Sequence, residues 1–321
     1  MKVVPGAAGY AATAATAAAA TVERPALAVA IGNFDGVHLG HAALLAEARA
    51  RAARRGGQSA VLTFTPHPAR LFAPDRAPPL IMSLDRRLAL IAEAGIDVAI
   101  VEPFTRAFAA IEAPAFVRDV LARDLGARDV VVGHDFSFGR GRAGDVRMLG
   151  DLGSAADMAV AVIPAICVDD QPCSSTLIRQ LVTDGDTTAA ARLLGRPFEL
   201  EGPVARGAGR GRGLGFPTAN VVPEGELRPK LGIYAARALV LDGPLAGTAR
   251  AAALSVGTNP QFSGAGVTIE AYLLDFDGDL YDRRLRIEVG QLLRNERRFE
   301  SIDALIAQIR EDVAQVRGIS S

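Results

Sequence analysis

The sequence is poor in the residues that mark small secreted domains and metal-binding modules. Among 321 residues there is no tryptophan, and cysteine occurs only twice, at Cys167 and Cys173. These cysteines have neither the spacing of a metal site nor partner histidines, so we expect reduced thiols that are buried or incidental. The composition therefore argues against a disulfide framework, and the expected location is cytoplasmic.

An excess of charge is also missing. The 35 Lys and Arg residues balance 36 Asp and Glu residues, which leaves a net charge of −1. A protein that binds nucleic acid through its phosphates usually carries a basic surface. We therefore expect no nucleic-acid partner.

Long runs of large apolar residues are absent, although 50% of the residues are hydrophobic. Alanine supplies much of that fraction, and it buries little area per residue. Residues 11–20, AATAATAAAA, lack leucine, isoleucine and valine and follow no basic cluster, which argues against a signal peptide. We predict no membrane span. Residues 1–22 carry no motif, and we expect a partly ordered N-terminal segment there.

Between Leu27 and about Gly185, short apolar runs alternate with helical patterns. The apolar runs are LAVAIGNF, SAVLTF, DVAIVEPF, RDVVVGHDF and MAVAVIPA, and the helical patterns include HAALLAEARARA, SLDRRLALIAEA, APAFVRDVLARDL and SSTLIRQLV. This alternation predicts an α/β domain, residues 23–185, whose parallel sheet is covered by helices on both faces.

Three unusual polar segments follow predicted strands of this domain, at residues 32–41, 66–68 and 133–139. Ligands of parallel α/β sheets bind beyond the carboxyl ends of the strands. These segments are therefore the candidate ligand-binding loops.

The pattern changes after a short helical linker at residues 186–196. The remainder of the second predicted domain, residues 186–321, contains β-rich runs such as IYAARALVL, VTIEAYLLDF and RLRIEVGQLL, separated by turn residues. These runs predict an antiparallel sheet or barrel. One amphipathic helix, SIDALIAQIREDVAQV, closes the chain.

The first candidate loop, GNFDGVHLGH, predicts an anion site. Gly36 and Gly40 permit a tight turn, and His38 and His41 stand where a helix begins. Free backbone amides and the positive end of a helix favour the binding of phosphate. Two imidazoles can donate hydrogen bonds to the oxygens of a phosphorus that is being transferred. A purely structural role suits a lone histidine better than a pair at this spacing.

The segment CSSTLIRQLV is compatible with the same chemistry. Ser174 or Ser175 can cap a helix, and the free amides beyond the cap, with Thr176 and Arg179, can hold phosphate oxygens. An ordinary capped helix explains these residues equally well when they are taken alone.

Several motifs together resemble one family. GNFDG, HLGH, PHP, GHDFSFG and SSTLIR, in this order, resemble the adenylyltransferase half of the bacterial bifunctional riboflavin kinase and FAD synthetase family. GRGRGLGFPTAN, RPKLGIYAAR, SVGTNP, VTIEAYLLDF and LYDRRLRIE resemble its flavokinase half. The resemblance covers nearly the whole chain from Leu27. It implies a Rossmann-like nucleotidylyltransferase domain followed by an antiparallel β-barrel flavokinase domain with a terminal helix.

In the first domain, the resemblance implies that the phosphate of FMN attacks the α-phosphorus of ATP and releases pyrophosphate. His38 and His41 would stabilise the developing charge. The other residues that the resemblance assigns to substrate binding are Asn33, Phe34, Asp35, Gly40, Asp135, Ser174, Ser175, Thr176 and Arg179. A direct role for His67 and a role in shaping its own loop are equally compatible with its place between two prolines.

In the second domain, GRGRGLGFPTAN contains no common phosphate-loop motif and no motif lysine. An RNA-binding RGG tract is the less favoured alternative, because the run is brief and ends in FPTAN. The resemblance implies that Thr218 and Asn220 bind Mg²⁺ with the ATP phosphates, that Gly215 and Pro217 contribute to nucleotide binding, and that Glu270 is the general base. By alternation alone, an outward-facing strand carboxylate is the favoured interpretation of Glu270, and only the motif match favours the base.

Two departures from the family pattern border the second site. Ala271 and Tyr272 follow Glu270 where the family has a histidine at the second position, and Gln261 interrupts an NPTF pattern.

The leading hypothesis is a bifunctional enzyme that acts on riboflavin, FMN and ATP. The alternatives are an FMN adenylyltransferase with a non-catalytic flavin-binding C-terminal domain and a non-catalytic flavin or nucleotide sensor. No motif indicates whether the chain has a protein partner.

Overall fold

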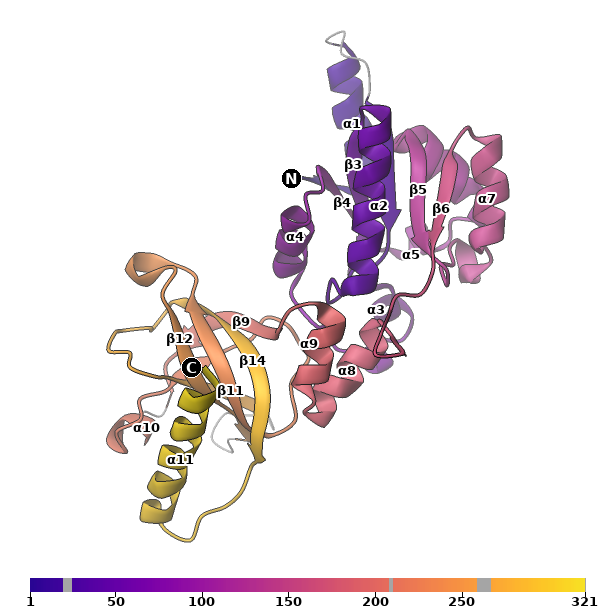
Figure 1. Cartoon of the computed structure of the whole chain (residues 1–321). Coiled ribbons are helices and arrows are strands. Elements are labelled where there is room, and N and C mark those ends of the chain that lie inside the picture. The colour runs from indigo at the N-terminus through magenta and orange to yellow at the C-terminus, as the bar shows by residue number, and fades with distance from the viewer. Residues whose placement is uncertain (20–24, 208–209, 259–266, 321) are drawn as a thin grey trace. The chain divides into compact units, whose positions relative to one another are not determined.

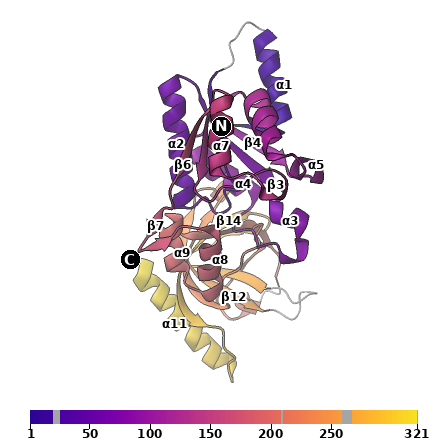
Figure 2. The ribbon, with the colours of Figure 1, turned by 90° about the vertical axis from the view of Figure 1, so that its right-hand side faces the viewer.

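The computed structural model describes residues 1–19, 25–207, 210–258 and 267–320 (Figures 1 and 2). It divides the chain into two compact units. The first unit comprises Met1–Pro78 and Leu84–Cys173, and the second comprises Pro79–Ser83 and Ser174–Ser321. The departures Asn259–Phe262, including Gln261, lie outside the described residues.

The first unit is built on a six-stranded sheet in the order β1-β4-β3-β2-β5-β6, and every neighbouring pair in it is parallel. All residues of β2 are buried, as the continuous apolar run predicts for a strand covered on both faces. The strands of this unit are β1 (Lys2–Pro5), β2 (Leu27–Ile31), β3 (Gln58–Thr65), β4 (Val98–Pro103), β5 (Ala127–Gly133), β6 (Ala159–Ile163) and a separate hairpin of β7 (Cys167–Val168) with β8 (Gln171–Pro172).

Helices pack against this sheet. The α-helices are α1 (Gly6–Ala19), α2 (Leu39–Arg55), α3 (Pro68–Phe72), α4 (Leu84–Glu93), α5 (Arg106–Ala109), α6 (Ala113–Ala115) and α7 (Val146–Ala155); η1 (Pro74–Arg76) and η3 (Arg140–Arg142) are 3₁₀ turns and η2 (Phe116–Asp124) is a π-helix. Helices α1 and α7 contact η2, whereas α2 packs along β2, β3 and β5 (Figure 1). The predicted α/β architecture is confirmed.

The N-terminal segment contains a strand and a helix. Residues 2–5 form β1, which pairs with the edge of β4, and α1 follows directly. Val4, Ala7 and Tyr10 are buried in the core of the first unit. The main-chain N–H of Ala7 donates to Oε2 of Glu102 at 2.7 Å. Local periodicity predicts neither β1 nor α1, because the short strand gains its stability from pairing with β4. Partial order over residues 1–22 stays a prediction.

The second unit contains a closed barrel in the strand order β10-β13-β12-β11-β14-β9. All of its pairs are antiparallel, so the predicted barrel is confirmed. Its strands are β9 (Phe198–Ala205), β10 (Ala219–Val221), β11 (Gly232–Val240), β12 (Ala249–Thr258), β13 (Val267–Leu273) and β14 (Arg284–Asn295); its helices are α8 (Ser175–Asp184), α9 (Thr187–Leu194), α10 (Arg210–Gly213), the 3₁₀ turn η4 (Gly243–Leu245) and α11 (Ile302–Ser320).

The terminal helix α11 packs on the outside of the barrel against β11 and β12 (Figure 2). Val316 on α11 is fully buried with Ala235 and Leu274. The guanidinium of Arg294 on β14 makes a two-pronged ion pair with the buried carboxylate of Asp312 on α11, with a shortest distance of 2.7 Å. These contacts attach the predicted terminal helix to the barrel.

Candidate active sites

The first candidate site begins with the turn between β2 and α2. Phe34, Gly36 and Val37 have φ angles of 51°, 88° and 39°. Positive φ is unfavourable for a phenylalanine or a valine and persists only where the surroundings hold the backbone in place. His38, the last residue of this turn, occupies the N-cap position of α2.

The two histidines of this turn lie against each other. Their rings are stacked, with centroids 3.7 Å apart and planes inclined by 21°. The main-chain N–H of His41 donates to Nδ1 of His38 at 3.3 Å, and the ring of Phe34 lies 5.2 Å from that of His41. A Cβ atom on Gly40 would lie 3.0 Å from Cε1 of His38, so this position suits glycine. The result is an imidazole pair at the positive end of a 17-residue helix, which suits an anion.

Two further candidate loops follow neighbouring strands of the same sheet. His67 follows β3 and caps α3, where its Nδ1 accepts from the N–H of Ala69 at 3.2 Å. This contact gives His67 a role in shaping its own loop. Asp135 is exposed on the turn after β5. Because β3, β2 and β5 are adjacent and parallel, the loops that carry these residues leave the same edge of the sheet as His38.

The predicted phosphate-binding helix is α8, in the second unit. Ser174 is its N-cap, and its Oγ accepts from the N–H of Leu177 at 3.2 Å. Ser175 opens the helix, and Thr176 is exposed. The Nε of Arg179 donates to the carbonyl oxygen of Pro79 at 2.8 Å. The structure thus groups His38 with His41 in one unit, and Ser174 with Arg179 in the other.

The second candidate site lies on the barrel, where β10 pairs with β13. Asn220 is the register partner of Glu270, and the hydroxyl of Thr218 donates to Oε2 of Glu270 at 3.2 Å. The neighbours of Glu270 in β13, Ile269 and Ala271, are buried, so the half-buried Glu270 faces the opposite side of the strand. Sequence reasoning placed these three polar residues in one site, and the structure brings them together.

The loop that precedes β10 covers this group. A Cβ atom on Gly207 would lie 2.1 Å from Nδ2 of Asn220, so the backbone passes directly over that amide. Gly215 has a φ of 85°, and the ring of Phe216 meets that of Tyr272 edge-on at 5.5 Å. Tyr272, the departure from the family histidine, therefore packs on the loop that carries Pro217 and Thr218. Gly209, the first residue of the GRGRGLGFPTAN motif, lies outside the described residues.

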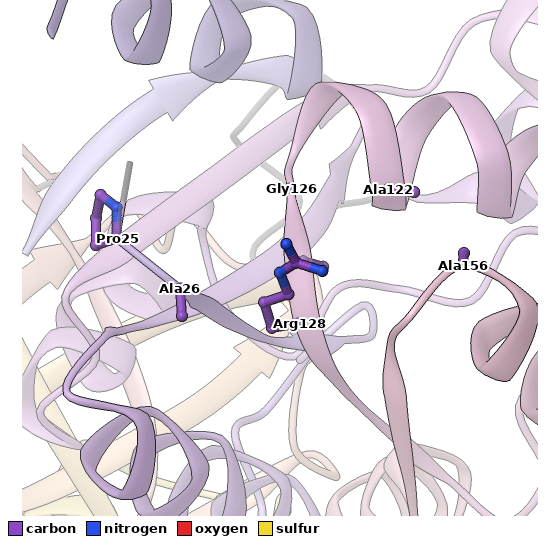
Figure 3. Close-up of a pocket in the computed structure, with 7 residues that line it drawn as sticks. Pro25, Ala26, Ala122, Gly126, Arg128 and Ala156 are labelled. Carbon is purple, nitrogen blue, oxygen red and sulfur yellow. The ribbon is translucent and has the colours of Figure 1, made fainter. Parts of the chain in front are cut away.

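A pocket of the first unit lies away from these residues. Pro25 and Ala26 before β2, and Ala127 and Arg128 at the start of β5, line it together with Ala156 (Figure 3). This is the amino edge of the sheet, and the Arg128 guanidinium is already paired with Asp157 at 2.8 Å. The pocket contains none of the predicted site residues.

Comparisons with known proteins assign both units to flavin enzymes. Residues 21–177 match the family model of FAD synthetase, and residues 194–320 match that of riboflavin kinase. The bifunctional riboflavin kinase/FMN adenylyltransferase of Escherichia coli (strain K12) is 39% identical over 288 residues, which cover 89% of this chain and 90% of that protein. The corresponding protein of Pseudomonas fluorescens is 38% identical and covers 91% of this chain and 92% of its own length.

The chain belongs to the bifunctional riboflavin kinase/FMN adenylyltransferase family. It phosphorylates riboflavin to FMN with ATP and then transfers the adenylyl group of a second ATP to FMN, giving FAD and pyrophosphate. The leading functional hypothesis is confirmed, and the sensor hypothesis is set aside. ATP is the co-substrate of both reactions.

One solved structure shares the fold of this bifunctional enzyme over its whole length. A protein of Streptococcus pneumoniae, described as a macrolide-efflux protein, matches with a TM-score of 0.83 at 26% sequence identity and covers 99% of each chain. Its name disagrees with the family models and the relatives, which all indicate flavin enzymes, so we carry over its fold alone. Within the described ranges, no helix is long and apolar enough to cross a membrane.

Sequence reasoning missed one charged residue of the adenylyltransferase unit. Arg87 on α4 is 3% exposed, and its Nη1 donates to the carbonyl oxygen of Asn33 at 2.8 Å. Burial lowers the pKa of the Arg87 guanidinium, and the negative charge of Asp35 opposes that shift. The helical pattern SLDRRLALIAEA contains a signal, since an arginine on an apolar helix face needs a partner. It does not say which loop supplies that partner.

Proposed function

We propose that adenylyl transfer takes place at the stacked pair of His38 and His41, in a catalytic domain of residues 23–185. Riboflavin phosphorylation is assigned to residues 186–321, with 186–196 as the linker helix. The single observation that supports the first assignment most strongly is the imidazole pair at the start of α2, where the helix presents its positive end. The family models, which match residues 21–177 and 194–320, support the same division.

In adenylyl transfer, an oxygen of the FMN phosphate forms a bond to the α-phosphorus of ATP, and the bond to the leaving pyrophosphate breaks. Charge grows on the phosphate oxygens as this happens. We assign His38 and His41 to stabilising that charge by hydrogen bonding. The remaining proposed substrate-binding residues are Asn33, Phe34, Asp35, Gly40 and Asp135.

For the pyrophosphate end of ATP we propose the start of α8. Ser174 caps α8, and the amides of the first turn point toward the N-terminal end of the helix. Ser175 and Thr176 add hydroxyl groups, and Arg179 adds a guanidinium. The Nε of this guanidinium donates to the carbonyl oxygen of Pro79.

In the kinase domain, we propose Glu270 as the general base. It takes the proton of the ribityl 5′-hydroxyl while that oxygen bonds to the γ-phosphorus of ATP and ADP leaves. The hydrogen bond from Thr218 orients the carboxylate. Gly215 and Pro217 belong to the loop that we assign to nucleotide binding.

We assign Mg²⁺ to Thr218 and Asn220 beside the ATP phosphates. The donor set fits this ion, because a hydroxyl oxygen and an amide oxygen stand next to a carboxylate on one face of the barrel. When bound, Mg²⁺ neutralises charge on the phosphates.

Since ATP is the co-substrate of both reactions, the cytoplasm is the proposed location.

The test separates the two sites in one polypeptide. The purified protein is incubated with riboflavin, ATP and Mg²⁺, or with FMN in place of riboflavin, and FMN and FAD are followed by chromatography. We expect His41→Ala to abolish FAD formation while FMN formation continues. We expect Glu270→Gln to abolish FMN formation while added FMN is still converted to FAD. Loss of both activities in either folded variant contradicts the assignment of separate sites.

A further inference from the structure

A buried cation supports the loop that precedes the histidine pair. Arg87 projects from α4, and a solvent-shielded guanidinium is costly unless hydrogen bonds and charges compensate it. Its neighbour Arg86 is buried to a similar degree, but its Nη1 pairs with Glu93 of the same helix at 3.0 Å. Arg87 is joined to the loop by its hydrogen bond to the carbonyl of Asn33.

The contact point is one main-chain oxygen. The carbonyl of Asn33 accepts from Nη1 of Arg87 at 2.8 Å and from the hydroxyl of Thr63 at 3.2 Å. Thr63 itself is fully buried on β3, and Nη1 of Arg87 lies 3.5 Å from its hydroxyl oxygen. Two donors from separate elements thus hold the same carbonyl.

The residues that follow this carbonyl connect it to the histidines. Phe34 has a φ of 51°, is fully buried, and places its ring 5.2 Å from that of His41. The carboxylate of Asp35 is 1% exposed and is electrostatically attracted to Arg87. A phenylalanine in the left-handed region is strained and needs external support. Both the carbonyl before Phe34 and the carboxylate after it interact with Arg87.

We propose that Arg87 is a positioning residue of the adenylyltransferase: it holds the Asn33 carbonyl so that Phe34 keeps His41 stacked on His38. The inference rests on the proposed role of the histidine pair. Arginine suits this position better than lysine, because its guanidinium stays charged when buried and offers several donors in a fixed plane.

The test compares Arg87→Met and Arg87→Lys with Arg86→Met, a buried control on the same helix. We measure kcat and KM for FAD formation from FMN and ATP, and riboflavin kinase activity in the same preparations. A group displaced by 1 Å loses about 100-fold in rate, so we expect Arg87→Met to lower kcat by about 10- to 100-fold. KM should change much less, kinase activity should stay within about twofold of wild type, and Arg87→Lys should recover part of kcat.

Four outcomes decide the matter. A folded Arg87→Met protein with the kcat of Arg86→Met overturns the inference, and so does a loss confined to KM. If Arg87→Met does not fold, Thr63→Val removes the second donor to Asn33 with little change in shape, and an unchanged kcat in that variant also overturns it. If His41→Ala keeps full FAD formation, the proposed site is wrong, and this result is distinct from a failure of the Arg87 variants alone.

Discussion

Replacement of Gly40 by alanine is expected to slow adenylyl transfer without harming the fold. Gly40 is the second residue of α2, and an added Cβ atom would lie 3.0 Å from Cε1 and 3.1 Å from Nδ1 of His38. The main-chain oxygen of Cys173 lies 3.4 Å from the same point. Since these contacts are shorter than nearly all real Cβ contacts, the imidazole of His38 has to move by a few tenths of an ångström.

The magnitude follows from the cost of misplacement. A shift of 1 Å in a catalytic group costs about 100-fold in rate, so a few tenths should cost about 10-fold. This corresponds to about 1.4 kcal/mol in the activation free energy of adenylyl transfer. The free energy of unfolding should change little or rise, because alanine is favoured over glycine inside a helix by up to about 1 kcal/mol. Activity and stability are therefore expected to move in opposite directions.

The assay is the rate of FAD formation from FMN and ATP, with FMN formation from riboflavin measured on the same sample. Gly150→Ala is the matched control, since Gly150 lies in α7 and an added Cβ atom meets nothing within 4 Å. We expect this control to keep both activities. A Gly40→Ala protein with wild-type FAD formation, or with equal losses in both reactions, refutes the reasoning.

Three further predictions concern other contacts. Asp312→Ala leaves the Arg294 guanidinium without its buried partner, and we expect the free energy of unfolding of the second unit to fall by about 3 kcal/mol in calorimetry; an unchanged transition contradicts this. Asn220→Ala should raise the Mg²⁺ concentration needed for half-maximal FMN formation, and an unaltered Mg²⁺ titration removes Asn220 from the metal site. Burial raises the pKa of the Glu102 carboxyl above its ordinary value of 4.5. The protonated side chain therefore contributes its full stabilisation below pH 4.5, and this stabilisation is lost as the pH rises through the raised pKa. Glu102→Gln, which keeps an acceptor for Ala7, should therefore raise Tm at pH 7 but not at pH 4, and equal shifts at both values contradict this reasoning.

The sequence predicted most of the secondary structure and the two fold classes, because these depend on local periodicity. The continuous apolar run at β2 marks a strand buried on both faces, and the alternation in β13 marks a barrel strand with one buried side. The candidate site residues were also recognisable, since each motif is contiguous. The stacking of His38 on His41 is such a local feature, because three residues separate them at the start of one helix.

The strand and the helix within residues 2–19 are two elements that local patterns do not predict. Strand β1 has four residues and gains its stability from pairing with β4, more than ninety positions later in the chain. Its alanine-rich continuation, α1, shows no pronounced apolar face and is held at its start by Glu102. The local pattern is therefore weak for both elements.

The sequence by itself determined the order of most strands and helices from β2 onward, the family and the two activities, because these are carried by short-range patterns and contiguous motifs. Only the tertiary structure decided which distant residues meet. It joined Arg87 to the carbonyl of Asn33, 54 positions away, and Thr218 to Glu270, 52 positions away. Such pairings arise when strands take their register and helices pack on them, and the free energy that selects them comes from the whole assembled core rather than from neighbours along the chain.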